Sequence, residues 1–420
     1  MLKRKRLNTG DRLLDYRVLD LSDMRGFLCG KILGDLGADV IKVEKPGGDP
    51  SRRIGPFYKN IPHPEKSLSW FVYNSNKRGI TLNIETEDGR RLFRQLVERA
   101  DVVIETFAPG YMKSIGLGYN ELSNSKLIMT SITPFGQDGP QSHYKDGDGV
   151  TWSMGGMTYI SGDPDRPPVR VSFPQSYSHA GAAAALGTML ALFYRDTTGE
   201  GQHVDVSIQE CVVQALMNVL PFWDIDKVNL KRAGQFRTGL SSTANQRLVW
   251  ECKDGAVNYP LYGGMTGARS NRGLTEWMND EGMGSEYMNS IEWERFDMGQ
   301  ATQDEFNIFE KDMARFFKAH TMEELYNESI KRRVMLYPVY SIREIVKSPQ
   351  LEAREFWEKV EHPELGDKLT YPGAFAKFSD FYIQIRRRAP LIGEHNEEIY
   401  CGELGLSKED LILLKQANVI

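Results

Sequence analysis

The chain has 420 residues, a formal net charge of −5 and 26% charged residues. This balance excludes a basic nucleic-acid-binding protein, and the 40% share of hydrophobic residues excludes a disordered chain. The length allows two domains. The four cysteines, Cys29, Cys211, Cys252 and Cys401, lie far apart in the sequence. That spacing argues against a disulfide framework and against a metal site, and it favours a reducing, cytoplasmic compartment.

Nothing in the sequence predicts a targeting or membrane-spanning segment. The amino end is basic but lacks the apolar region of a signal peptide. The apolar stretch 180–194 is rich in alanine and too short to cross a bilayer, so we interpret it as a buried helix. We therefore expect neither a membrane nor a nucleic acid among the partners.

The first 135 residues alternate short apolar runs with helical stretches. The predicted strands are residues 17–21, 40–43, 80–84, 102–105 and 127–132. Helical spacing of apolar residues predicts helices at 27–36 and 87–100. This alternation indicates an α/β fold with a parallel sheet and helices on both faces. Residues 198–202 (TGEGQ) are typical of a turn before a further strand, HVDVSI.

The pattern changes near Phe222. Residues 230–335 are highly charged and lack clean alternation, which indicates a smaller second domain that is inserted into the first or follows it. Helices are predicted at 341–347, 351–359 and 407–416, the last beginning with a capping box at Ser407.

Lys42 and Lys45 follow a predicted buried strand and precede a Gly-Gly turn. Strand carboxyl ends bind ligands in open α/β sheets, so both lysines could meet phosphates or could simply be solvated. No glycine-rich dinucleotide signature and no P-loop follows any strand.

Five ordered motifs resemble the class III coenzyme A-transferases, the CaiB/BaiF family. They are VLDLSDMRGFLCGKILGDLGADVIKVEKPGGDPSR at 18–52, the segment 74–110 that ends in FAPG, ITPFGQDGP at 132–140, and the segments 192–210 and 389–410. The resemblance implies a Rossmann-like large domain, 1–225 with 336–420, and a smaller α+β domain, 226–335. It also implies an interlocked, ring-like dimer.

The resemblance implies coenzyme A thioesters as substrates, with no permanently bound cofactor. The family's coenzyme A contacts fall on Lys45, Leu82, Asn83, Ile84, Phe107 and Lys145. One departure is Ser114, which stands where the family has an arginine that would grip a phosphate, and Lys113 beside it is a partial substitute.

The family's nucleophilic aspartate falls on Tyr177 in this sequence. A carboxylate is needed because it forms an acyl anhydride as reactive as the thioester, and a phenol with a pKa near 10 cannot replace it. No catalytic residue is therefore assigned. The alternative carboxylates nearby are Asp146, Asp148, Asp163 and Asp165, each of which is also an ordinary turn residue. His179 is either a base or nucleophile, or a structural residue at the start of a helix.

These departures favour the non-catalytic subunit of a heterodimeric or heterotetrameric CoA-transferase, paired with an Asp-bearing paralogue. Two-subunit members of the family imply succinyl-CoA as donor and an acid such as benzylsuccinate as acceptor. The alternatives are a stand-alone CoA-binding scaffold protein and a transferase that uses another carboxylate. The racemase branch needs a histidine where this chain has Asp146, together with the missing aspartate.

Two segments are expected near the substrate. Met24, Arg25 and Phe27 would line the pocket together with the small domain. The segment 262–267 (YGGMTG) is either the glycine-rich loop that covers the family's reaction site or a simple hairpin turn.

Overall fold

The structure, a computed structural model, describes residues 15–122, 125–145, 147–238 and 244–420. The chain separates into two compact units. The larger unit runs to Met157 and includes residues 171–221 and 352–420, and the smaller unit comprises residues 158–170 and 222–351. The domain boundaries expected at 225/226 and 335/336 stay a prediction, and residues 158–170, expected in the large domain, group with the smaller unit.

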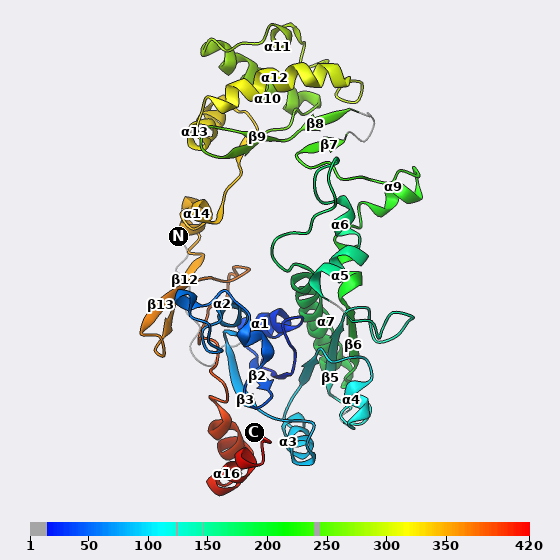
Figure 1. Cartoon of the computed structure of the whole chain (residues 1–420), viewed down its shortest axis with the longest axis vertical. Coiled ribbons are helices and arrows are strands. Elements are labelled where there is room, and N and C mark those ends of the chain that lie inside the picture. The colour runs from blue at the N-terminus through cyan, green and yellow to red at the C-terminus, as the bar shows by residue number, and fades with distance from the viewer. Residues whose placement is uncertain (1–14, 123–124, 146, 239–243) are drawn as a thin grey trace. The chain divides into compact units, whose positions relative to one another are not determined.

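Six parallel strands form the central sheet of the larger unit, in the order β3-β2-β1-β4-β5-β6 (Figure 1). They are β1 (Arg17–Asp20), β2 (Asp39–Glu44), β3 (Lys77–Thr81), β4 (Val102–Glu105), β5 (Ile128–Thr133) and β6 (His203–Ser207). The order reverses between β1 and β4. In open α/β sheets, ligands bind outside the carboxyl ends of the strands at such a point. The predicted α/β fold with a Rossmann-like parallel sheet is confirmed.

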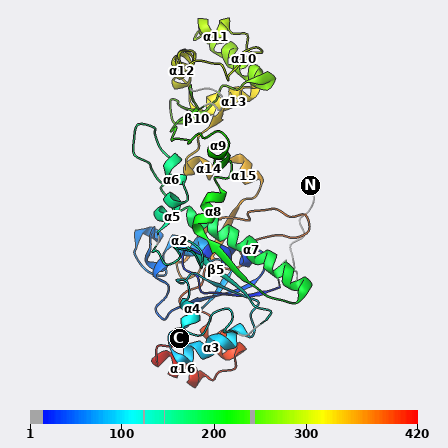
Figure 2. The same cartoon turned by 90° about the vertical axis from the view of Figure 1, so that its right-hand side faces the viewer.

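Helices cover both faces of this sheet. They are α1 (Phe27–Asp35), α2 (Leu68–Asn74), α3 (Glu87–Val97), α4 (Tyr111–Ser114), α5 (Asp148–Met154), α7 (Ser176–Thr198), α8 (Ile208–Gln214) and α16 (Lys408–Gln416). Successive strand residues point to opposite faces. Val18 therefore packs with α1 and α7, whereas Leu19 packs with α3 and the C-terminal residues. Figure 2 shows α7 lying across the sheet in front of β5.

The C-terminal part of the chain covers the outer edge of β3. Asn76 donates its backbone N–H to the carbonyl of Arg387, and His395 donates its own to the carbonyl of Gly79. The side chain of Asn396 accepts the backbone N–H of Thr81 at 2.9 Å. An edge paired in this way is closed to further strands.

Several predicted bounds need correction. The predicted strand 80–84 is placed too late in the sequence, since β3 begins at Lys77 and ends at Thr81. Leu82 and Ile84 lie beyond the strand, and their side chains pack in the core that includes residues of α3. The predicted helix 351–359 is correct only over 351–353, since α15 (Pro349–Ala353) ends there and is followed by the hairpin β12 (Trp357–His362) and β13 (Asp367–Pro372). The capping box of the last helix is confirmed, with Asp410 as the partner of Ser407.

The smaller unit has its own aromatic core. Its elements include β7 (Phe236–Thr238), β8 (Asn245–Arg247), β9 (Val249–Glu251), β10 (Ala256–Asn258), α10 (Gly264–Asp280), α11 (Glu286–Ser290), α12 (Gln303–Lys318), α13 (Met322–Arg332), β11 (Tyr337–Pro338) and α14 (Ile342–Ile345). Two short helices, α6 (Met157–Ile160) and α9 (Leu220–Asp224), contain the points where the chain passes from the larger unit to the smaller one. Trp250, Trp277 and Phe309 are buried in this core. The segment 262–267 contains the first turn of α10, so the hairpin interpretation is wrong.

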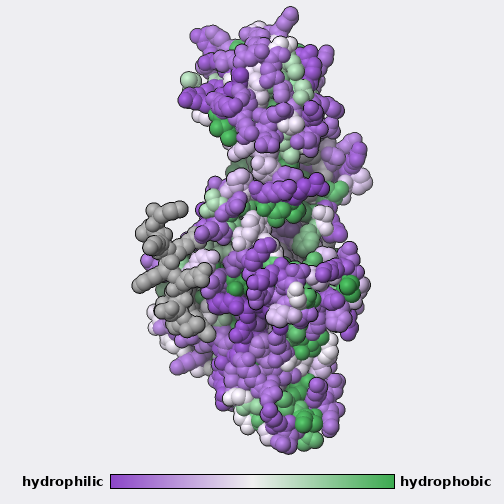
Figure 3. Space-filling model, turned by 90° about the vertical axis from the view of Figure 1, so that its left-hand side faces the viewer, coloured by the Kyte–Doolittle hydropathy of each residue, from purple (hydrophilic) through white to green (hydrophobic). Residues whose placement is uncertain are grey.

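The face of the molecule drawn in Figure 3 is mostly polar. Figure 3 shows one face on which hydrophobic residues gather in small separate patches among hydrophilic ones. Within the described ranges, every helix is too short or too polar to cross a membrane.

Candidate functional site

A buried charge network lies below the carboxyl ends of β1, β2 and β3. Lys77 donates to the carboxylate of Asp20 at 2.7 Å and to the carbonyl of Phe27 at 3.0 Å. Lys42 donates to the carbonyls of Asp20 and Ser22. Burial opposes the charge on Asp20, but the two ammonium groups outweigh it and hold its pKa below the usual value. Lys42 is fully buried, so both earlier interpretations of it, phosphate ligand and solvated surface lysine, are wrong.

At the edge above this network, side chains from three strand ends meet. Lys45, after β2, forms an exposed ion pair with Glu85 at 2.7 Å. Tyr111 donates its hydroxyl to the same carboxylate at 3.2 Å, and its ring lies 4.8 Å from that of Phe107. The structure therefore brings Lys45 and Phe107 together through Glu85 and Tyr111. Sequence reasoning missed both of these linking residues.

The remaining coenzyme A positions differ in what they can offer. The side chains of Leu82 and Ile84 are buried in the core, so only their backbone can face a ligand. Asn83 shapes the turn, because its side chain accepts the backbone N–H of Glu85 at 3.1 Å. Lys145 is exposed.

The position where the family has an arginine offers no cation of its own. Ser114 donates its hydroxyl to the carbonyl of Tyr111 at 2.7 Å. Lys113 beside it is exposed in α4. The site residues named from the sequence stay a prediction.

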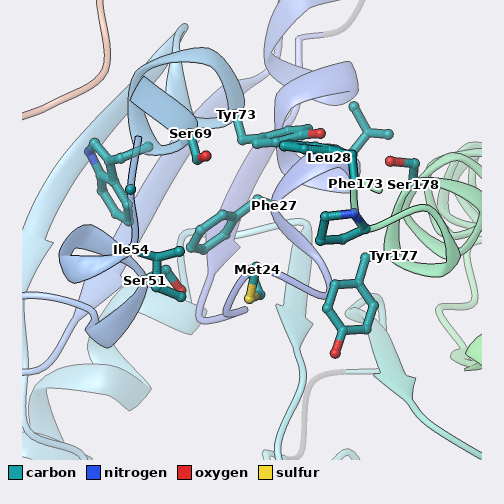
Figure 4. A pocket seen from close by; sticks show the side chains of 13 residues that line it. Met24, Phe27, Leu28, Ser51, Ile54, Ser69, Tyr73, Phe173, Tyr177 and Ser178 are labelled. Carbon is teal, nitrogen blue, oxygen red and sulfur yellow. The ribbon is translucent and has the colours of Figure 1, made fainter. Parts of the chain in front are cut away.

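A pocket of about 660 Å³, open solvent included, lies beside α1 and the start of α7. Figure 4 shows side chains from α1, α2 and α7 facing this space. Its lining comprises Met24, Phe27, Leu28, Ser51, Ile54, Gly55, Ser69, Trp70, Tyr73, Phe173, Pro174, Tyr177 and Ser178. The expected Met24 and Phe27 are among them, whereas Arg25 forms an ion pair with Asp23 at 2.7 Å. All of these residues belong to the larger unit.

Tyr177 is the second residue of α7 and is half-buried in the pocket wall. Asp148, at the start of α5, lies close by. One of its carboxylate oxygens accepts the backbone N–H groups of Gln175 and Ser176 at 2.8 and 2.9 Å and the hydroxyl of Ser176 at 2.8 Å. Asp148 therefore caps α7 from another helix and is not the turn residue that the sequence suggested.

The other candidate residues lie elsewhere. Asp163 and Asp165 are exposed in the smaller unit, and Asp146 lies outside the described residues. The ring of His179 lies 5.8 Å from that of Trp152, which fits the structural interpretation of this histidine. Among the described residues, no group of three or more histidine, cysteine, aspartate or glutamate side chains could hold a metal ion.

Glu105 is a titratable residue that the sequence analysis did not single out. Burial raises its pKa to about 7, against hydrogen bonds from the hydroxyl of Ser131 and the backbone of Phe107. Ser131 also contacts the ring of His203 at 2.8 Å. The only sequence signal was a glutamate at the end of a buried apolar strand.

Comparison with known proteins gives consistent matches along the chain. The family described as CoA-transferase family III matches residues 13–396. Succinyl-CoA:(R)-benzylsuccinate CoA-transferase subunit BbsE of Thauera aromatica is 35% identical over 94% of this chain and 96% of the relative. Succinyl-CoA–D-citramalate CoA-transferase of Chloroflexus aurantiacus is 32% identical, covering 97% of each chain. The crystal structure of a CaiB/BaiF family protein from Brucella suis superposes with a TM-score of 0.81 at 27% identity, covering 93% of this chain and 99% of the other.

Proposed function

Because the chain belongs to CoA-transferase family III, we propose that it is the non-catalytic subunit of a heteromeric CoA-transferase. Its relatives transfer CoA between acids, so the activity is that of a transferase with CoA thioesters as substrates. The donor is succinyl-CoA, and the acceptor is a carboxylic acid such as benzylsuccinate. The 35% identity to the benzylsuccinate CoA-transferase subunit supports this choice. The complex works in the cytoplasm.

The observation that carries this proposal is Tyr177 in the wall of an apolar pocket. In the Asp-bearing partner, a carboxylate attacks the thioester carbonyl, the C–S bond breaks, and CoA leaves as the thiolate while an anhydride forms. A neutral phenol cannot do this at pH 7. Asp148 is a poor substitute, because three hydrogen bonds to one of its oxygens fix it at the start of α7.

The exposed face of α7 supports an assembly with a partner chain. Leu186, Leu190 and Phe193 follow one another at helical spacing, and their side chains are 56%, 60% and 74% exposed. A stripe of this kind on a long helix is typical of an interface. We propose that an Asp-bearing paralogue covers it. The relative of Thauera aromatica is likewise named as a subunit.

Coenzyme A would contact Lys45, Phe107, Lys145 and the backbone of residues 82–84. Lys45 is exposed, so a phosphate can replace Glu85 as its partner at little cost in free energy. The ring of Phe107 is held by that of Tyr111 and can stack on adenine.

The test compares this chain alone with the chain co-expressed with Asp-bearing paralogues. CoA transfer from succinyl-CoA to benzylsuccinate is followed by chromatography, and acyl adducts are trapped with hydroxylamine and located by mass spectrometry. We expect transfer only from the complex and adducts only on the partner. Turnover by this chain alone, with an adduct on Asp148 or another of its carboxylates, would contradict the proposal.

A further inference from the structure

Among the residues that the structure describes, no charged side chain lines the pocket beside α1. Rings and aliphatic groups dominate it, and its side-chain polar groups are the hydroxyls of three serines and two tyrosines. The indole N–H of Trp70 is already donated to the carbonyl of Pro390 at 3.2 Å. Transfer of a carboxylate or phosphate from water into such a space, without a cation to pair with it, costs several kcal/mol. The described lining therefore disfavours succinate and the phosphates of coenzyme A as occupants. It favours an apolar group.

Two aromatic residues of the pocket lining, Phe27 and Trp70, are held in place by buried charged groups. The rings of Phe27 and Trp70 meet edge to face at 5.4 Å. The ammonium groups of Lys42 and Lys77 lie 5.2 and 5.4 Å from the ring of Phe27. Both lysines are fixed by the buried network with Asp20, so Phe27 cannot easily change its orientation.

Trp70 is also held in place by a buried arginine. The guanidinium of Arg52 lies 3.7 Å from the indole centre. Arg52 is itself buried and donates to the carboxylate of Glu44 at 2.6 and 2.8 Å. Because both rings are fixed before a ligand binds, binding costs little side-chain conformational entropy. A planar ligand can then contact them in the edge-to-face geometry that aromatic rings prefer.

We propose that this pocket binds the aromatic ring of a carboxylic acid and carries out no chemistry on it. The carboxylate of the ligand stays in water at the mouth, since the described residues of the lining include no cation. Tyr177 in the wall replaces a reacting group with one more ring. The inference that the ligand has an apolar ring follows from the lining of the pocket alone. The inference that the ligand is a carboxylic acid depends on the proposed function.

The test is calorimetric titration of the full chain with 3-phenylpropionate, propionate and succinate. We expect 3-phenylpropionate to bind at least ~10-fold more tightly than the other two, because only its ring buries apolar surface. Ser178→Phe and Ser69→Phe each add a ring to the pocket wall and should weaken binding of 3-phenylpropionate at least ~10-fold. Thr197→Phe, at an exposed position of the same helix, should leave it unchanged.

Circular dichroism and thermal unfolding establish that each variant is folded. Equal binding of 3-phenylpropionate and propionate, or unchanged binding by both filled variants, would overturn the proposal. The transfer assay on the co-expressed complex keeps the two proposals apart. Binding without any transfer would contradict the proposed function alone, and transfer without pocket-dependent binding would contradict this inference alone.

Discussion

Among single residues, Glu105 combines burial with a position at the end of β4. Its pKa is raised from 4.5 to about 7 by burial, although two hydrogen bonds oppose the shift. One of them comes from the backbone N–H of Phe107 at 2.6 Å, in the turn that carries a proposed coenzyme A contact. The protonation of Glu105 is therefore linked to the stability of this edge of the sheet.

The sign of this linkage follows from the two pKa values. Between about pH 4.5 and about pH 7 the folded state holds a proton on Glu105 that the unfolded state has lost. The free energy of unfolding therefore falls as pH rises through this range, by an amount on the order of 3 kcal/mol for this group. Glu105→Gln should remove that loss, measured by urea unfolding at about pH 5 and about pH 8. Glu98→Gln, at an exposed site, should keep it. An equal pH dependence of Glu105→Gln and the native chain would contradict the linkage.

Tyr177 allows a second residue-scale prediction. Tyr177→Asp supplies a carboxylate in a pocket whose lining includes Met24, Phe27 and Leu28, and burial there would raise its pKa and leave less of it ionised to attack the thioester. Ser114 also offers no cation to hold the thioester. We expect CoA transfer by the variant alone to stay at least ~100-fold below that of an Asp-bearing homologue. Tyr177→Asn is the matched control. Activity near that of the homologue would show that the rest of this site is intact.

At the scale of elements, the contact between α1 and α7 depends on small residues. Ala180, Ala184 and Ala185 of α7 are buried against the sheet and α1. A Cβ atom on Gly181 would lie 2.8 Å from Cβ of Leu28 and 3.3 Å from the backbone N of Cys29. Because Leu28 also lines the pocket, the spacing of these helices sets the shape of that pocket.

Gly181→Val should therefore separate the two helices and lower the free energy of unfolding by about 1–3 kcal/mol. Ala182→Val places the same side chain on the exposed side of the helix and should cost about 0.5 kcal/mol or less. Urea unfolding of both variants measures the difference. Equal stabilities would mean that the helices can move apart without cost.

Apolar runs predicted β1 and β4 well, because their residues alternate between two buried layers on either side of the sheet. Helical spacing predicted α1 and α3 well, because each buries one apolar face. The pattern of apolar residues failed to predict the start of β3, where a charged side chain is buried. Lys77 begins β3 inside the protein because Asp20 neutralises it, and a pattern of apolar residues cannot reveal such a partner distant in sequence. The pocket was predictable only at Met24 and Phe27, since Trp70 and Tyr73 reach it from a separate helix.

At the scale of the whole molecule, the sheet and its helices provide the edge proposed to bind coenzyme A and an apolar pocket, whereas our proposal places the reacting carboxylate on another chain. The chain also exposes Leu190 and Phe193 on its longest helix, a surface that a stable monomer would rarely keep. Both features are explained if a second chain supplies the carboxylate and covers α7.

This explanation predicts how the assembly will respond to charge on α7. The double variant Leu190→Glu/Phe193→Glu puts two carboxylates where the partner would bury apolar side chains. Affinity for the partner should therefore fall at least ~100-fold, while the chain stays folded. Native mass spectrometry of the co-expressed chains measures the loss of the complex. Ile412→Glu changes an exposed apolar residue of α16, 57% exposed, and should leave assembly intact. If the double variant assembled as well as Ile412→Glu, α7 would not be the contact, and the partner would have to bind another face.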